Sequence, residues 1–240
     1  MSPELRMWIE VSFNTLYLIV VWALVVLMTR RLGEVSKENY PVANRLRWAF
    51  VLLALGDSGH VGFRVAAYAL GGVEANPLLL GIGTLATAIT VTFFYVVMLD
   101  IWRLRFNKKY GLFEYGLLAL VPIRLIVMAL PGNDWGSPTP PEFFGLLRNV
   151  FLILFGIGIL YLYLRDAIKS KDRLFRWIAY CVFFSYLFFT PVILWATQIP
   201  LLGMLMIPKT VMYVAVAVLA YYGLWPQKKV VAAPLPSSAD

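Results

Sequence analysis

Three ionisable residues, Asp57, His60 and Arg64, follow one another at spacings of three and four residues. On an α-helix this spacing places all three side chains on one face. A guanidinium can hold an anion, and an imidazole beside a carboxylate can act as a general acid or base. The residues around them are mostly apolar or glycine. The sequence therefore predicts a functional site inside an apolar helix rather than on a solvated surface.

Further polar residues interrupt other apolar segments of the chain. Glu10, Asn14 and Tyr17, at spacings i, i+4 and i+7, share a face of a second helix. Three further cations, Arg124, Arg148 and Lys209, each fall within or at the end of a separate apolar segment. The four cations inside the apolar segments outnumber the two carboxylates there. Because unbalanced charge in lipid is unfavourable, we expect a water-filled cavity opening outward or a bound anion. The predicted ligand-binding residues are Asp57, His60, Arg64, Arg124, Arg148, Lys209, Glu10, Asn14 and Tyr17.

Membrane-spanning helices must position these residues. The chain has 240 residues, 61% hydrophobic and 14% charged, whereas soluble domains average about 45–50% apolar and about 25% charged. Seven apolar segments are long enough to cross a hydrocarbon core of about 30 Å, and the gaps between them are too short for a soluble domain. We expect an all-α fold, a single bundle of seven transmembrane helices at 8–29, 48–70, 80–102, 110–131, 146–166, 176–198 and 201–224.

The lysines and arginines predict the orientation of this bundle. Sixteen of the 21 follow the first, third, fifth and seventh segments, and the connections after the second, fourth and sixth contain none. Basic loops stay in the cytoplasm, so the N-terminus is expected outside, the C-terminus in the cytoplasm, and the site in the outer half. We expect a multi-pass protein of a cell membrane, plasma or inner. Residues 1–229 form the transmembrane domain, and 230–240 a disordered cytoplasmic tail.

Composition also excludes several classes of partner. The net charge of +8 is explained by basic loops that meet lipid headgroups, so the expected partner is the lipid bilayer and not nucleic acid. No protein partner can be named. A single histidine, His60, and a single cysteine, Cys181, leave no basis for a zinc site or a disulfide framework, and we expect no metal and no cofactor. Asp100, Glu114 and Asp166 lie near the cytoplasmic helix ends and are expected to pair with the basic loops.

Resemblances to known families fail at particular residues. The stretch Gly-Asp-Ser-Gly at 56–59 resembles the nucleophile motif of serine proteases, but it lies in mid-helix and Ser58 points away from the polar face. The rhomboid proteases need a serine and a histidine on separate helices, and ceramidases and adiponectin receptors bind zinc through several histidines, whereas this chain has only His60. Lys209 and the aromatic segment 176–198 resemble a retinal protein, but Leu205 stands where microbial rhodopsins carry an acid.

Four interpretations of function remain after these exclusions. The favoured one is a receptor-like or ligand-binding protein whose cavity binds a small anionic or amphipathic ligand, such as a lipid headgroup, a carboxylate or a phosphate. The second is a transporter of a small anion. The third is an intramembrane lipid-modifying enzyme with His60 as general acid–base and Asp57 orienting it. The fourth is a set of structural ion pairs only, Asp57 with Arg64 and Glu10 with Lys209.

Overall fold

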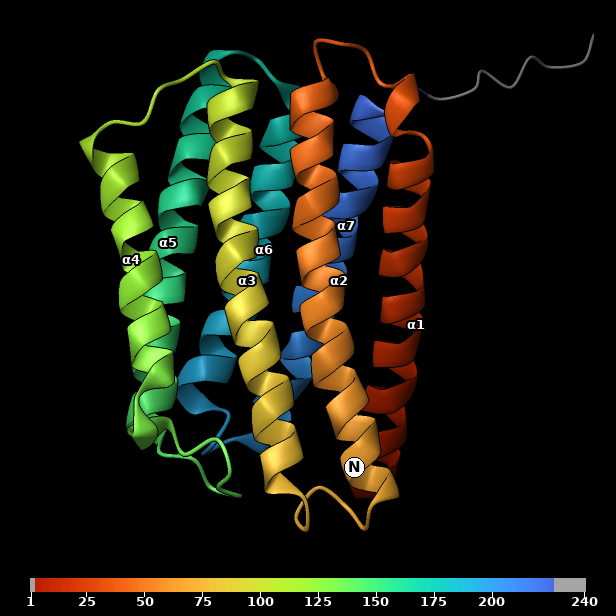
Figure 1. Cartoon of the computed structure of the whole chain (residues 1–240), viewed down its shortest axis with the longest axis vertical. Helices are drawn as coiled ribbons and strands as arrows, with labels where there is room; N and C mark the ends of the chain where they lie inside the picture. Colours follow the sequence, from red (N-terminus) through yellow and green to blue (C-terminus); the bar gives the residue numbers. More distant parts are fainter. Residues whose placement is uncertain (1–2, 227–240) are drawn as a thin grey trace, which may run out of the picture.

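Seven long helices run side by side in one bundle (Figure 1). The computed structural model describes residues 3–226, without the side chains of residues 3, 4, 6 and 7. Within this range the fold is all-helical, and all seven long helices are apolar enough to cross a membrane. The helices are α1 (Pro3–Arg30), α2 (Tyr40–Ala69), α3 (Pro77–Arg105), α4 (Leu112–Ala129), α5 (Glu142–Lys169), α6 (Arg173–Trp195) and α7 (Met206–Leu224), with 3-10 turns η1 (Leu32–Glu34), η2 (Pro131–Asn133) and η3 (Pro200–Leu205). The predicted fold class is confirmed.

Helix boundaries differ from the prediction where polar residues extend a helix beyond its apolar part. α2 begins at Tyr40 rather than at 48, because Pro41 suits the first turn of a helix and Arg47 donates to the Asn44 side chain at 2.9 Å. The last predicted helix is divided, since η3 precedes α7. The predicted tail, 230–240, lies outside the described residues.

Chain turns at the helix ends have local causes. α2 is followed by Gly71 and Gly72 with φ of 106° and 107°, a conformation that glycine adopts without steric strain. The Asp172 side chain accepts a hydrogen bond from the Phe175 backbone at 3.1 Å and caps α6. At α4 the Glu114 carboxylate accepts from the Gly111 backbone at 2.8 Å and caps the helix. Among residues 3–226 it forms no ion pair of the kind that the sequence predicted.

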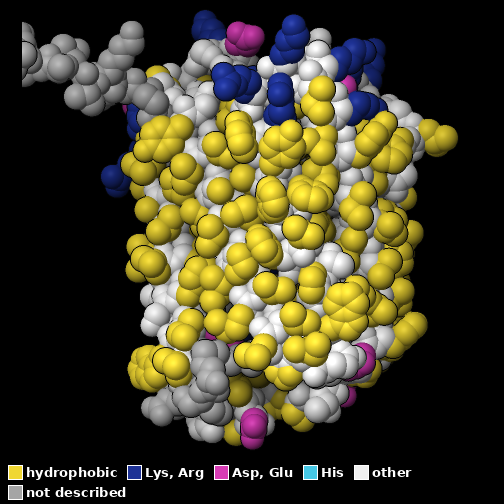
Figure 2. Space-filling view, turned by 180° about the vertical axis from the view of Figure 1, so that it is seen from behind, with side chains coloured by type: hydrophobic (Ala, Val, Ile, Leu, Met, Phe, Trp, Pro, Cys, Tyr) yellow, Lys and Arg dark blue, Asp and Glu magenta, His cyan; other side chains and the backbone are white. Residues whose placement is uncertain are grey.

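Basic side chains gather at one end of the molecule, and a broad belt of hydrophobic side chains covers its middle (Figure 2). The basic end carries the connections α1–α2, α3–α4 and α5–α6, whereas the described N-terminus and the other connections lie at the opposite end (Figure 1). This arrangement agrees with the charge pattern in the sequence. The direction in which the bundle crosses the membrane stays a prediction from that pattern.

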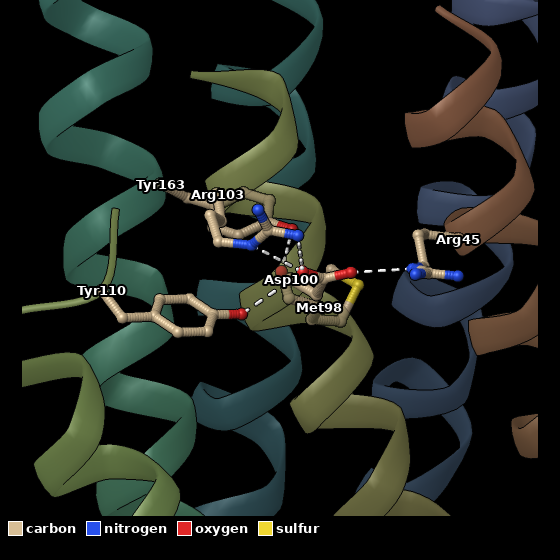
Figure 3. A network of polar contacts seen from close by, with 6 residues as sticks. All are labelled: Arg45, Met98, Asp100, Arg103, Tyr110 and Tyr163. Atoms are coloured by element: carbon tan, nitrogen blue, oxygen red, sulfur yellow. Dashed lines mark hydrogen bonds and ion pairs between the residues drawn. The ribbon is translucent and has the colours of Figure 1, made fainter. Parts of the chain in front are cut away.

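Ion pairs near the basic end join the helices to one another. The Asp100 carboxylate accepts hydrogen bonds from Arg45 on α2 at 2.7 Å and from Arg103 at 2.6 Å, and Tyr110 approaches the same carboxylate at 3.4 Å (Figure 3). In the same view the Tyr163 hydroxyl of α5 donates to the carbonyl of Met98 at 2.8 Å.

A second acid near the basic end, Asp166, also forms the ion pairs that the sequence predicted. Asp166 lies 2.7 Å from Arg165 and 3.7 Å from Lys108. The pairing predicted for Asp100 and Asp166 is therefore confirmed.

An aromatic core fills the bundle between the basic end and its middle. Phe50, Phe94, Tyr95, Trp102 and Phe155 are all at most 2% exposed and belong to one cluster of buried residues. These rings pack against one another in the half of the bundle near the basic end. The cavity lined by the predicted site residues lies in the other half.

Candidate functional site

A cavity of about 430 Å³ lies in the half of the bundle opposite the basic end. Its size is within the usual range for a site that binds a small molecule. The cavity is lined by residues of α1 to α7 and of η3. All nine residues that the sequence predicted for the site line it: Glu10, Asn14, Tyr17, Asp57, His60, Arg64, Arg124, Arg148 and Lys209. The structure thus gathers residues that are up to about 200 positions apart, while their role in binding a ligand stays a prediction.

Asp57 joins three helices through hydroxyl groups. Its carboxylate accepts a hydrogen bond from the Tyr17 hydroxyl of α1 at 2.6 Å and another from the Thr87 hydroxyl of α3 at 2.7 Å. Within the described residues it forms no ion pair. A carboxylate held by two donors keeps a fixed position in an apolar environment, and its other lone pairs remain available to the cavity.

Arg64 forms an ion pair with another charged residue of the cavity wall. Its Nη1 lies 3.4 Å from Oε2 of Glu10, which joins α2 to α1. The side chains of Arg64 and Glu10 are 34% and 20% exposed, so this pair is partly accessible. The pairings predicted by the structural interpretation, Asp57 with Arg64 and Glu10 with Lys209, are wrong, because Arg64 extends to Glu10 instead.

His60 lines the cavity without a hydrogen bond to Asp57. Its Nδ1 is buried and makes no hydrogen bond to any described residue. The carboxylate that was expected to orient the imidazole is bonded to Tyr17 and Thr87 instead. Ser58 lies off the polar face, as its hydroxyl accepts from the Trp22 indole of α1 at 2.9 Å. The arrangement therefore contains no Asp–His pair.

Arg124 is a buried cation whose hydrogen bonds all go to uncharged groups. It is 3% exposed; its Nε donates to the carbonyl of Arg148 at 2.8 Å, and its Nη1 donates to the carbonyl of Ala88 at 2.6 Å and to the hydroxyl of Thr92. Its Nη2 has no hydrogen bond to the described residues. The guanidinium is held firmly by α3 and α5, but no carboxylate in the described part of the chain compensates its charge.

Arg148 connects the cavity to the α4–α5 connection. Its Nη1 donates to the side-chain oxygen of Asn133 at 3.0 Å, and its guanidinium carbon lies 4.5 Å from the centroid of the Trp135 ring. Stacking on an indole stabilises a cation without neutralising it. Arg148 is therefore a second cation of the cavity wall without a carboxylate partner among the described residues.

Lys209 is the third such cation. Its Nζ lies 4.5 Å from the ring centroid of Phe189 on α6 and 5.6 Å from that of Tyr213 on α7, and it has no hydrogen bond or ion pair with the described residues. The Tyr213 hydroxyl in turn pairs with that of Tyr95 at 2.8 Å. Two aromatic faces thus surround the ammonium group at the cavity wall.

Several lining residues were not predicted. They are uncharged polar or aromatic residues of transmembrane helices, types that usually serve packing, and include Thr84, Thr87, Asn149, Ser185, Tyr186, Phe189 and Tyr213. The spacing of Thr84, Thr87 and Val91, at i, i+3 and i+7, is a signal that would have placed a face of α3 in the site. No comparable spacing singles out the aromatic residues.

Neither the arrangement of possible metal ligands nor similarity to known proteins assigns a function to this cavity. In the described part of the chain, no group of three or more His, Cys, Asp or Glu side chains could hold a metal ion. No family model, no curated protein and no solved structure matches the chain. The geometry and charge of the cavity are thus the observations from which its function has to be argued.

Proposed function

We propose that this integral membrane protein binds a small anionic or amphipathic ligand in its cavity, as a receptor-like or ligand-binding protein. One observation carries the proposal: three cations of the cavity wall, Arg124, Arg148 and Lys209, have no carboxylate of the described residues within ion-pair distance. An anion in the cavity would supply the missing negative charge.

The energetic reason is the low dielectric of the bundle interior. An ion removed from water is unfavourable by several kcal/mol unless a counter-ion or hydrogen bonds compensate it. Arg124 has hydrogen bonds for two of its nitrogens, yet its charge is not neutralised. A guanidinium binds carboxylate or phosphate oxygens in a bidentate manner, and its free Nη2 provides part of such a contact.

The enzyme interpretation is less well supported than ligand binding. General acid–base catalysis by His60 would benefit from a carboxylate that orients the ring, but the Asp57 oxygens are bonded to Tyr17 and Thr87. Anion transport uses the same cavity and differs only in whether the site opens in turn to both sides of the membrane. The first experiment therefore asks about binding.

Binding is tested on protein purified in lipid nanodiscs. Small molecules are extracted and identified by mass spectrometry, and the midpoint of thermal unfolding is measured while phosphate or a small carboxylate is titrated. A bound anion raises the midpoint in proportion to the logarithm of its concentration above its Kd. We expect Lys209→Gln and Arg148→Gln to weaken binding roughly tenfold or more, since each removes a charge-assisted contact of about 1.5–3 kcal/mol.

Arg45→Gln is the matched control, because Arg45 pairs with Asp100 at the other end of the bundle. It should leave the midpoint shift caused by the anion unchanged. Absence of any co-purified or titrated anion, with no effect of Lys209→Gln or Arg148→Gln other than lower stability, would favour the structural interpretation and overturn the proposal.

The effect of His60→Ala distinguishes a binding protein from an enzyme. In a binding protein His60→Ala should alter anion affinity less than Lys209→Gln does, because the proposal has the anion contact the cations of the wall rather than the imidazole. In an enzyme the same change should abolish turnover of the co-purified molecule while leaving its binding nearly intact.

A further inference from the structure

A second cavity of about 270 Å³ adjoins the first beneath the α4–α5 connection. We call it the loop pocket; it is lined by Val73, Glu74, Pro77, Leu80, Gly81, Thr84, Trp135, Ser137, Pro138, Pro140 and Arg148. Two of these residues, Thr84 and Arg148, also line the main cavity. The two cavities are therefore neighbours, and these two residues belong to the walls of both.

The loop pocket is chiefly apolar. Proline, leucine, valine and tryptophan side chains form most of its wall, and its single acid, Glu74, is exposed and belongs to its rim. At the junction the Thr84 hydroxyl donates to the Leu80 carbonyl of its own helix at 2.8 Å, so this donor is already satisfied. An apolar chain can pass this residue without leaving a hydroxyl unpaired.

The wall of the loop pocket is well fixed. Asn133 is fully buried, and its amide donates to the carbonyl of Val127 at 2.6 Å, while the Trp135 indole donates to that of Met128 at 3.1 Å. The Trp135 carbonyl lies directly over Gly81 of α3, where any side chain would collide with it. The pocket is thus a preformed space, as expected for a binding site.

Charge is distributed unevenly around the main cavity. On the side of α1, α2 and α7, two acids, Glu10 and Asp57, equal in number the two cations, Arg64 and Lys209, although Lys209 forms an ion pair with neither acid. The lining residues of α3, α4, α5 and α6 include two cations, Arg124 and Arg148, and no acid. An anion is therefore attracted to the two arginines, and a doubly charged one would neutralise both.

We propose that the ligand is a phosphate monoester with a single apolar chain. Its phosphate lies in the main cavity against Arg124 and Arg148, and its chain passes Thr84 into the loop pocket. This inference rests on the proposed function and adds the class of ligand and its position. A phosphate monoester carries about two negative charges at pH 7 to 8, which matches the charge of the arginine pair. Arg148 then contacts both parts of the ligand, because it lines both cavities.

The test compares three probes on protein in lipid nanodiscs at about pH 8, where the phosphate is a dianion. The probes are inorganic phosphate, hexyl phosphate below its micelle-forming concentration, and hexanol, and their dissociation constants are measured by calorimetry. We expect hexyl phosphate to bind at least about tenfold more tightly than inorganic phosphate, since each buried methylene adds a factor of roughly four. Hexanol should show no measurable binding.

A matched pair of variants locates the chain. Ser137→Trp places a large ring in the loop pocket, whereas Thr139→Trp adds the same ring at a neighbouring exposed position that does not line the pocket. Ser137→Trp should remove most of the advantage of hexyl phosphate over inorganic phosphate and leave the affinity for inorganic phosphate unchanged. Thr139→Trp should change neither. Val73→Phe, which narrows the pocket from the α2–α3 connection, should act like Ser137→Trp.

The other outcomes separate the two proposals. Equal affinity for inorganic and hexyl phosphate, or an advantage that survives both Ser137→Trp and Val73→Phe, overturns the chain site while anion binding stands. Hexanol binding as tightly as hexyl phosphate overturns the anionic ligand, since the phosphate then contributes nothing. No binding of any phosphate or carboxylate overturns both proposals.

Discussion

At the residue scale, Asp57 is a junction between α1, α2 and α3 as well as a part of the cavity wall. We predict that Asp57→Asn lowers the free energy of unfolding by about 1–3 kcal/mol, because an amide has one acceptor oxygen for the two hydroxyl donors. Unfolding in denaturant at constant detergent concentration measures it.

Tyr17→Phe tests whether the hydrogen bond from Tyr17 to Asp57 causes this loss of stability. It removes one of the two donors, so the double variant with Asp57→Asn should be less destabilised than the sum of the single changes. Strict additivity of the two changes would show that the hydrogen bond from Tyr17 to Asp57 does not couple them.

The second residue-scale prediction concerns the shape of the Arg124 side chain. Arg124→Lys keeps the charge but replaces a planar fork by a single ammonium group, which cannot reach the acceptors on α3 and on α5 together. We expect a loss of about 1–3 kcal/mol in unfolding free energy. Arg45→Lys is the control, since Arg45 is about half exposed, and should change stability by less than about 1 kcal/mol. Equal losses would contradict a particular role for Arg124.

At the element scale, α2 and α3 pack most closely, and glycines permit it. A Cβ on Gly56 would collide with the Thr90 side chain and lie 3.2 Å from the Thr87 backbone, and one on Gly59 would lie 3.3 Å from Ala86. Gly62 has open space around it, so Gly56 and Gly59 face α3 and Gly62 does not. The close approach matters for the site because it brings Thr87 to Asp57.

This difference gives a paired prediction. Gly56→Ala should destabilise the bundle by about 1–3 kcal/mol, because the stiff Thr90 side chain cannot move aside freely. Gly62→Ala should be neutral or stabilise by up to about 1 kcal/mol, since alanine is the better helix former. Unfolding monitored by circular dichroism compares them, and an equal effect of the two changes would contradict the packing assigned to α2 and α3.

At the scale of the whole molecule, basic side chains gather at one end of the bundle (Figure 2). The residues that line the cavity lie in the half away from that end. We predict that in intact cells a membrane-impermeant thiol reagent labels Ser137→Cys but not Lys171→Cys, both in a Cys181→Ser background. The reason is that basic connections are retained in the cytoplasm. The reverse pattern would place the cavity on the cytoplasmic side.

The sequence by itself determined the number of helices, the fold class and the segregation of charge, because length, hydropathy and loop charge depend on local composition. It also identified the charged residues of the cavity wall, since a charge inside an apolar segment is conspicuous in a one-dimensional pattern. Helix ends at Tyr40 and at Met206 were missed, as hydropathy does not detect where a helix continues into polar residues or changes to a 3-10 turn.

Only the tertiary structure decided which polar groups meet. Arg64 pairs with Glu10 rather than with Asp57, because the chain path and side-chain reach bring α1 beside the last turns of α2. The hydroxyl of Thr87, the rings beside Lys209 and the loop pocket carry no signal of charge, so they emerged only when seven helices were packed together. A site of this kind depends on contacts between distant segments, and composition along the chain does not specify such contacts.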